Sequence, residues 1–241
     1  MGPPPRPLPY AAAHAFVADL AAPVLDDDDR HHLERVLRLQ PGQAVTVSDG
    51  RGGWRRCTWR GGGRVDPAGP EEVEAPADPL VTVAFALTKG ERPEWVVQKL
   101  TEVGVDRIIP FRAARSVVRW DEEKAAGQAG RWRRVARQAA MQSRRARLPE
   151  VAAVAAFAEV VAVATVTAAL AAPEGGPPSL DRPTLLVGPE GGWDEGELAC
   201  GLPVVGLGPT VLRAETAAMA AAVLLCGLRN ATVHPAGVRE R

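Results

Sequence analysis

Residues 185–198 read LLVGPEGGWDEGEL, and they decide how the rest of the chain is interpreted. An apolar run ends abruptly in GPEGG at residues 188–192, and an acidic segment with helical character follows. Strands that are apolar throughout are typical of a parallel sheet covered on both faces. Glycine lets a ligand approach the main chain closely and leaves N–H and C=O groups free to bind it. The stretch therefore predicts a buried strand that opens into a ligand-binding loop.

Two more glycine-containing segments are predicted at the same edge of the sheet. GLGPTVLRAET at residues 206–216 leads into the last helix, and LAAPEGG at 170–176 is less distinctive. In open α/β sheets, ligands bind outside the carboxyl ends of the strands. These loops contain neither a phosphate-binding Gly-Lys-Ser/Thr motif nor a Gly-x-Gly-x-x-Gly dinucleotide motif. One loop alone would be interpreted as a tight turn or a helix cap. Two of them, with Arg213 and Glu215 beside the second, favour a ligand such as an adenine held by main-chain groups.

Residues 80–241 alternate between apolar strand candidates and helix candidates. The strands are expected at 80–86, 107–111, 164–170, 184–188 and 204–208. The helices are expected at 92–104, over the arginine-rich stretch near 131–147, and at 214–228. This alternation predicts an α/β fold built on a parallel sheet.

The N-terminal part of the chain has a different character. Residues 30–39 place Leu33, Val36 and Leu37 at helical spacing, which predicts a short amphipathic helix. Residues 44–48 and 54–60 alternate like the two strands of a hairpin around the turn at 49–53. The Pro-, Gly- and acid-rich residues 64–79 are expected to form a linker. The predicted organisation is a disordered extension (1–13), a small mostly β domain (14–75) and a larger domain (80–241).

The composition of the chain limits which classes of protein and function are compatible with it. The chain has 241 residues, 46% of them hydrophobic, which suffices for one large or two ordinary domains. No run of eighteen apolar residues occurs, so no membrane span is expected, and the N-terminus lacks a signal-peptide pattern. Cys57, Cys200 and Cys226 are odd in number and far apart, so neither a disulfide framework nor a metal site is predicted. The expected compartment is a reducing cytoplasm.

The charge distribution is uneven although the net charge is zero. Residues 112–147 contain eleven Lys and Arg but three acids, and 131–147 contain seven arginines and no acid. A neutral protein with one strongly basic segment is typical of a local contact with a polyanion. Most of these arginines would equally suit a solvated helix face, with Trp132, Val135 and Ala139 turned inward.

The glycine motifs also carry a resemblance to a known family. LLVGPEGGWDEGEL (185–198) and LGPTVLRAETAAMAA (207–221) resemble the SPOUT class of RNA methyltransferases, and specifically the RsmE family. The ordered set of motifs is specific and covers nearly the whole chain after residue 14. The matching segments are 31–53, 87–111, 115–119, 131–132 and 142–151.

The resemblance implies a fold and an activity. The fold would be a SPOUT-type parallel sheet with a C-terminal trefoil knot, preceded by a small PUA-like β-barrel domain that binds RNA. The enzyme would be a homodimer that uses S-adenosyl-L-methionine to methylate N3 of a specific uridine near the 3′ end of 16S rRNA in the small ribosomal subunit. No metal would be needed. The family usually has an arginine near the position that His14 occupies here. If that arginine contacts RNA in relatives, the same contact is in doubt in this chain.

The resemblance also assigns candidate site residues. Arg213 could stabilise negative charge on a uracil oxygen, and Glu190 could accept the N3 proton. The candidate cofactor-binding residues are Gly188, Glu190, Gly191, Leu207, Gly208, Leu212, Arg213, Thr216 and Ala217. The candidate RNA-binding residues are Lys89, Arg115, Arg119, Gln142 and Arg144.

Several alternatives stay open. Glu215 is a second candidate for the base, although an acid at this position could equally cap the last helix. The enzyme could methylate another position, such as a ribose hydroxyl of tRNA. The chain could also be a non-catalytic RNA-binding assembly factor, although the intact glycines at 188, 191 and 208 argue against that.

Overall fold

The computed structural model describes residues 8, 11–118, 120–164 and 166–234. The chain forms two compact units, and neither is continuous in sequence. Of the described residues, those within 77–136 and 149–234 form the larger unit, and those within 8–76 and 137–148 form the smaller. Residues 137–148, which the sequence division places in the larger domain, therefore pack with the smaller unit.

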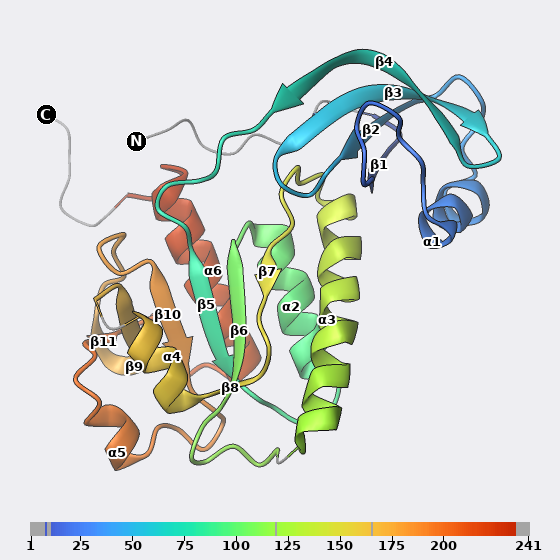
Figure 1. The fold of residues 1–241 in the computed structure, drawn as a ribbon. Helices are drawn as coiled ribbons and strands as arrows, with labels where there is room; N and C mark the ends of the chain where they lie inside the picture. Colours follow the sequence, from blue (N-terminus) through green and yellow to red (C-terminus); the bar gives the residue numbers. More distant parts are fainter. Residues whose placement is uncertain (1–7, 9–10, 119, 165, 235–241) are drawn as a thin grey trace, which may run out of the picture. The chain divides into compact units, whose positions relative to one another are not determined.

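The larger unit is built on a parallel sheet of seven strands (Figure 1). Its order is β11-β9-β10-β5-β6-β7, and β8 also pairs with β6. The strands are β5 (Thr82–Ala86), β6 (Arg107–Arg112), β7 (Glu150–Val151), β8 (Ala155–Ala156), β9 (Ala168–Gly176), β10 (Thr184–Val187) and β11 (Val204–Val205). β5 and β10 are buried along their whole length, as their apolar sequences predict. The expected α/β class with a parallel sheet is confirmed.

Helices cover both faces of this sheet. On one face, α2 (Arg92–Val103), α3 (Glu122–Gln142) and α6 (Ala214–Arg229) share one hydrophobic core with Val83, Phe85 and Leu185. On the other face lies α4 (Phe157–Ala164) (Figure 1). It packs with residues that include Phe111 and Trp193.

Helix α2 shows how closely local sequence sets an element. Pro93 lies in its first turn, where the missing N–H costs nothing. Gly104 ends the helix at φ 108°, a left-handed conformation that glycine adopts without strain. The face between them buries Val96, Val97 and Leu100, as the periodicity predicts.

Between β8 and β10, one expected strand starts too early and one expected loop is wrong. The strand expected at 164–170 begins at Ala168, and helix α4 occupies Phe157–Ala164 before it. A short run of apolar residues fits a buried strand and a buried helix equally, so periodicity alone does not separate them. The loop expected at 170–176 is instead the second part of β9.

The smaller unit contains a four-stranded sheet in the order β1-β2-β3-β4. The strands are β1 (Ala13–Phe16), β2 (Ala44–Ser48), β3 (Gly53–Gly61) and β4 (Arg64–Val73). The hairpin of β2 and β3 is confirmed. The linker expected at 64–79 is wrong over its first part, because β4 pairs with β3 in antiparallel register. β4 lies at the edge of the sheet, and an edge strand tolerates Pro67 and Pro70 because one side of its backbone needs no partner.

The helix expected at 30–39 is also modified. Helix α1 (Asp27–His31) continues directly into η1 (His32–Val36), a π-helix with a wider turn. Leu33 is buried, whereas Val36 is 60% and Leu37 43% exposed. The three residues do not share a buried face because a π-turn breaks the 3.6-residue spacing from which that face was inferred.

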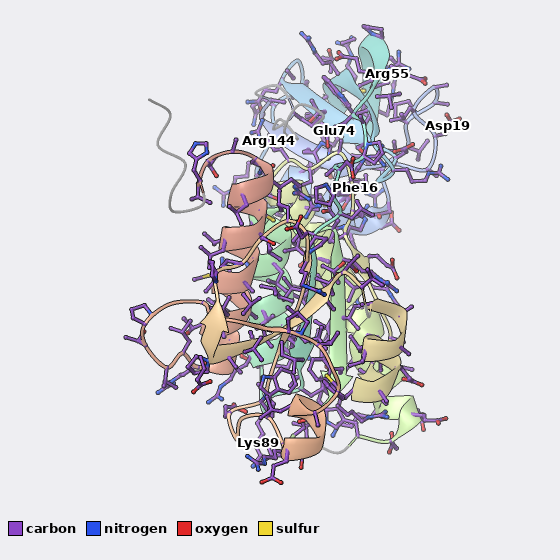
Figure 2. The ribbon with its side chains drawn as sticks, turned by 90° about the vertical axis from the view of Figure 1, so that its left-hand side faces the viewer. Phe16, Asp19, Arg55, Glu74, Lys89 and Arg144 are labelled. Atoms are coloured by element: carbon purple, nitrogen blue, oxygen red, sulfur yellow. The ribbon has the colours of Figure 1, made fainter. Side chains whose placement is uncertain are left out.

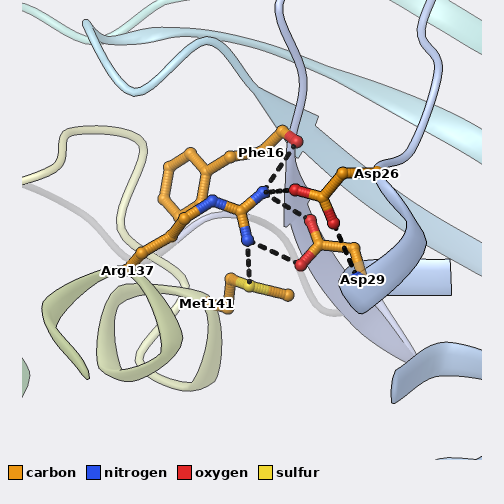
Figure 3. A network of polar contacts seen from close by, with 5 residues as sticks. All are labelled: Phe16, Asp26, Asp29, Arg137 and Met141. Carbon is orange, nitrogen blue, oxygen red and sulfur yellow. Dashed lines mark hydrogen bonds and ion pairs between the residues drawn. The ribbon is translucent and has the colours of Figure 1, made fainter. Parts of the chain in front are cut away.

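Arg137, in the last part of α3, is at the centre of a polar network in the smaller unit (Figure 3). Its guanidinium donates to both carboxylate oxygens of Asp29 at 2.6 Å and to Asp26 at 3.0 Å. It also donates to the Phe16 carbonyl at 3.3 Å. These contacts raise the pKa of Arg137, chiefly through the hydrogen bonds to Asp29. The network ties the end of α3 to β1 and α1.

Within the part of the chain that the structure describes, none of the helices has the length and apolar character needed to cross a membrane.

Candidate active site

A cavity of about 320 Å³ lies at the carboxyl ends of β9, β10 and β11. Five segments line it: the outer part of β9, the end of β10 with the loop that follows it, the last residue of α5 (Glu195–Leu198), the loop after β11 and the first turn of α6. The first two loops named by the sequence therefore meet at one site, with β9 as the third wall. The lining residues are Ala171, Ala172, Pro173, Glu174, Val187, Gly188, Pro189, Glu190, Gly192, Trp193, Leu198, Leu207, Gly208, Thr210, Val211, Leu212, Ala214 and Ala217.

Trp193 forms a fixed aromatic wall of this cavity. Its indole Nε1 donates to the Ala171 carbonyl at 2.9 Å, and its ring stacks on Phe111 with 6.1 Å between centroids. A Cβ atom at Gly188 would lie 2.9 Å from the Trp193 ring. Glycine is therefore required at 188 to let the indole pack under the loop.

The main chain at the end of β9 approaches the main chain at the end of β11 very closely. A Cβ atom at Gly175 would lie 2.2 Å from the carbonyl carbon of Val205, and one at Gly206 would lie 2.7 Å from the Gly175 carbonyl oxygen. The Gly206 N–H donates to the Gly176 carbonyl at 2.8 Å. Glycines 175 and 206 thus allow two segments that line the cavity to be packed backbone against backbone.

The acidic residues after the glycine loop have a structural role. Asp194 caps α5 (Glu195–Leu198) by accepting from the N–H groups of Gly196 and Glu197. Glu197 is buried, and its Oε1 accepts from the Ala114 N–H at 2.8 Å. The segment 194–198 therefore anchors the glycine loop to the loop that follows β6.

The structure brings most of the predicted cofactor residues together. Those that line the cavity are Gly188, Glu190, Leu207, Gly208, Leu212 and Ala217. Three do not line it. Gly191 is exposed, and its carbonyl accepts from Arg115 Nη1 at 3.2 Å. Arg213 and Thr216 are exposed residues at the start of α6, where the Arg213 carbonyl accepts from the Ala217 N–H.

An ion cluster beside the cavity contains a residue that sequence reasoning missed. Arg92 Nη1 lies 2.5 Å from Glu190 Oε1, and Arg92 Nε lies 3.9 Å from Glu215 Oε1. Glu215 Oε2 is buried and has no hydrogen-bond partner among the described residues. Arg92 belongs to the segment 87–111 of the resemblance, but Lys89 was singled out there, since nothing in a linear sequence shows which cation will face two distant glutamates.

The predicted RNA-binding residues divide between the two units. Lys89, labelled in Figure 2, is exposed and follows β5 by three residues, and Arg115 is exposed in the loop after β6. Gln142 and Arg144, the latter labelled in Figure 2, belong to the smaller unit. Arg144 adopts φ 56° and donates to the Ala11 carbonyl. Arg119 lies outside the described residues.

His14 points into the smaller unit. It is 3% exposed, and its ring nitrogens contact Thr46 Oγ1 at 2.9 Å and the Arg145 carbonyl at 3.2 Å. Burial lowers the pKa of His14 to about 4, so the imidazole is neutral at physiological pH. A buried neutral ring cannot take over a surface contact of an arginine with RNA.

No group of three or more His, Cys, Asp or Glu side chains that could hold a metal ion occurs among the described residues. The charged groups at the cavity include Glu174 in its lining and the cluster of Arg92, Glu190 and Glu215.

Comparisons with known proteins agree with this geometry. A family model for an RNA methyltransferase domain matches residues 76–226, and one for an RNA methyltransferase PUA domain matches 25–58. The ribosomal RNA small subunit methyltransferase E of Mycobacterium tuberculosis is 40% identical, in an alignment that covers 83% of this chain and 84% of that protein. The protein of the same name from Bacillus subtilis is 32% identical over 79% of this chain and 84% of its own length.

Solved structures show the same likeness. A ribosomal RNA small subunit methyltransferase E from Neisseria gonorrhoeae, bound to S-adenosyl methionine, superposes with a TM-score of 0.76 and 28% identity. The superposition covers 90% of this chain and 97% of that one. A Legionella pneumophila methyltransferase with bound SAM gives a TM-score of 0.75 at 26% identity, over 88% and 96% of the two chains. The chain therefore belongs to the RNA methyltransferase family that contains the ribosomal RNA small subunit methyltransferases E.

Proposed function

We propose that this protein transfers a methyl group from S-adenosyl-L-methionine to N3 of a specific uridine near the 3′ end of 16S rRNA in the small ribosomal subunit. The observation that carries the proposal is the cavity at the carboxyl edge of the sheet, walled by the glycine loops and flanked by the Arg92 cluster. The names of the relatives support a ribosomal RNA substrate, and the resemblance to the RsmE family supports N3.

The residues present fit the cofactor. The cavity volume of about 320 Å³ lies in the range of small-molecule sites, roughly 300–1,000 Å³. Gly208 adopts φ 146° with open space where a side chain would be, so its main chain is accessible to a ligand. Leu207 and Leu212 would give apolar contacts to the adenine, and Gly188 and Gly208 main-chain contacts. When bound, the cofactor supplies an electrophilic methyl group on a sulfonium.

The protein's own task is to prepare the uridine. The N3 proton titrates well above neutral pH, so a base must accept it before or as the nitrogen attacks. Glu190 lies at the cavity and is a candidate acceptor. Arg213 does not line the cavity, but it stands between two residues that do, Leu212 and Ala214, and from there would stabilise negative charge on a uracil oxygen. N3 lies on the Watson–Crick edge, so the target base must be unpaired or extruded.

Cationic and polar side chains on both units would hold the RNA. Lys89 and Arg115 of the larger unit would contact phosphates, and Gln142 and Arg144 would contribute from the smaller unit. Arg119, outside the described residues, stays a candidate from the sequence alone. Because each phosphate contact releases counterions, binding to the small subunit should weaken steeply with salt. Assembled small subunits should be better substrates than short oligonucleotides.

Primer extension on ribosomal RNA tests the proposal. A methyl on N3 blocks base pairing, so reverse transcriptase should stop next to the target in wild-type cells and read through in cells without the gene. Purified protein and S-adenosylmethionine should restore the stop on deficient subunits. An unchanged stop after deletion, or a label on a ribose or on tRNA, would contradict the assignment. A protein that bound subunits but no cofactor would be an assembly factor instead.

A further inference from the structure

Glu174 is a residue of the cavity to which the proposed function gives no task. The described residues that line the cavity are uncharged except for Glu174 and Glu190. Glu190 is paired with Arg92. Glu174 is exposed, and its side chain has neither an ion pair nor a hydrogen bond among the described residues. Its carboxylate therefore keeps both oxygens available as acceptors for a ligand in the cavity.

A wide bulge in β9 brings Glu174 to the cavity. Residues 171–175 of β9 stand out of register between two consecutive residues of β11, Val204 and Val205. The first four of them, 171–174, line the cavity. Bulges are frequent beside active sites, where they direct a side chain away from the regular pattern of the sheet. This one makes the end of β9 a wall of the cavity, with a free acceptor on it.

The bulge lies against the loop to which the adenine is assigned. A Cβ atom at Gly206 would lie 2.7 Å from the carbonyl oxygen of Gly175, the residue after Glu174. Gly206 immediately precedes Leu207 and Gly208, the residues proposed to contact the adenine. In the cofactor, the ribose is bonded directly to the adenine. Its hydroxyls are therefore the donors of the sugar and methionine parts that lie closest to this wall.

We propose that the Glu174 carboxylate accepts hydrogen bonds from the two ribose hydroxyls of the cofactor and so selects ligands that carry an intact adenosine. The inference rests on the proposed function, which places S-adenosylmethionine in this cavity. The two oxygens of a carboxylate can accept from two neighbouring hydroxyls at once. An acidic residue also hydrogen-bonds the ribose in dinucleotide-binding α/β folds, although these carry it on a different element.

Two other groups of the cofactor would attract a carboxylate, namely the sulfonium and the ammonium of the methionine part. Water and salt weaken a simple attraction between charges at an exposed position such as Glu174. Hydrogen bonds to an ionised acceptor are stronger than those between neutral groups. The three contacts also differ in which ligands they distinguish, and binding measurements can therefore separate them.

Calorimetric titration with four ligands tests the assignment, with displacement titration for those that bind weakly. The first is S-adenosylmethionine, and the second is S-adenosylhomocysteine, which lacks the sulfonium charge. The others are analogues of S-adenosylhomocysteine, one without the amino group and one without the two ribose hydroxyls. The variants are Glu174→Ala and Glu174→Gln. Glu123→Gln is the control for the loss of one negative charge, because Glu123 is exposed on α3 and does not line the cavity.

Glu174→Ala should weaken the binding of the three ligands that have ribose hydroxyls by about 10- to 100-fold, because hydrogen bonds to a charged acceptor are lost. Its affinity for the ligand without these hydroxyls should stay within about threefold of wild type, since no donor is left to lose the contact. Glu174→Gln should fall between, because the amide oxygen can still accept from one hydroxyl. Glu123→Gln should bind all four ligands like the wild type.

Three results would overturn the assignment to the ribose. An equal loss in Glu174→Ala for ligands with and without ribose hydroxyls would show that the contact lies elsewhere. A loss confined to S-adenosylmethionine would assign Glu174 to the sulfonium, and a loss that spares the ligand without the amino group would assign it to the ammonium. Unchanged affinity for all four ligands would remove Glu174 from the site.

The wild-type titration separates this inference from the proposed function. A wild type that bound neither S-adenosylmethionine nor S-adenosylhomocysteine would overturn both. Wild-type binding together with unchanged affinities in Glu174→Ala would overturn the inference alone. A methyl found on a ribose or on tRNA would overturn the proposed target and leave the role of Glu174 in place.

Discussion

At the scale of single residues, Gly188 is tightly constrained. It follows the buried strand β10, and the Trp193 ring occupies the space that a side chain at 188 would need. The same ring is held by the Ala171 carbonyl and by Phe111. Trp193 can therefore move little to relieve a clash.

Gly188→Ala should weaken S-adenosylmethionine binding by about 10-fold or more, because the added methyl displaces the indole that walls the cavity. Gly191→Ala is the control, since its Cβ would lie at an ordinary 3.4 Å from Arg115 Cβ. It should bind within about threefold of wild type. Calorimetric titration measures both, and a greater loss in Gly191→Ala would place that residue, and not Gly188, against the cofactor.

His14 should make the protein sensitive to mild acid. Its pKa is about 4 in the folded chain and 6.5 in the unfolded chain. Below pH 6.5 the unfolded chain therefore binds a proton that the buried ring does not, and folding stability falls until about pH 4. The loss from this residue is at most roughly 3 to 4 kcal/mol.

His14→Gln should remove this part of the acid sensitivity, because the amide can bond Thr46 and the Arg145 carbonyl without titrating. Urea unfolding at pH 7 and pH 5 measures it. His31→Gln, at an exposed position, is the control and should follow the wild type. If the free energy of unfolding fell equally between pH 7 and pH 5 in His14→Gln and in the wild type, the expectation would be contradicted.

At the scale of elements, α3 is divided between the two units. Trp132 and Ala136 belong to the core of the larger unit, and Ala140 and Met141 to that of the smaller one. The basic segment that suggested a polyanion contact is therefore partly structural. Arg137 binds acids at 26 and 29, and Arg133 donates to the Val151 carbonyl at 3.0 Å.

Arg137→Met should lower the free energy of unfolding by roughly 3 kcal/mol, because it leaves the buried Asp29 carboxylate without its counter-ion. Arg30→Met is the control. Arg30 pairs with Asp27 at 3.0 Å, but the two side chains are 48% and 89% exposed, so the change should cost less than about 1 kcal/mol. Chemical denaturation measures the free energy of unfolding of both variants. Equal losses would mean that the buried network contributes no more to stability than the exposed ion pair.

At the scale of the whole molecule, α6 indicates assembly. It buries Ala218, Ala221, Ala222 and Leu225 against the core, yet Val223 is 46% exposed. A helix that is apolar around so much of its surface is typically covered by another element or by a partner. The homodimer and the trefoil knot implied by the resemblance stay predictions.

Light scattering should give a mass about twice 25.5 kDa. Val223→Glu should shift the protein towards monomer at micromolar concentration, because it places a charge in the apolar contact. Val163→Glu, at a position 74% exposed on α4, is the control and should keep the wild-type mass. A wild-type monomer that turns over would contradict the dimer.

Local sequence was sufficient to predict those helices and strands whose residue pattern is compatible with one type of secondary structure. The strands β5, β6 and β10, the hairpin of β2 and β3, and the helix α2 lie where spacing, Pro93 and Gly104 place them. The two glycine loops were enough to predict where the cavity lies, at the carboxyl edge of the sheet, and its use as the cofactor site stays a prediction. Their expected partner at 170–176 also contributes, although as part of β9.

Tertiary structure decided the features for which the sequence pattern allows more than one outcome, namely the form of two segments and the burial and pairing of several ionisable side chains. Residues 64–73 form a strand because they pair with the edge of β3. The apolar residues 157–164 would fit a strand or a helix by sequence alone, and they form a helix that packs in a core with sheet residues. The tertiary structure also turned His14 and Arg137 inward and brought Arg92 between Glu190 and Glu215. The physical reason is the same in each case. Burial and ion pairing depend on which distant segments meet, and sequence spacing describes only neighbours along one element.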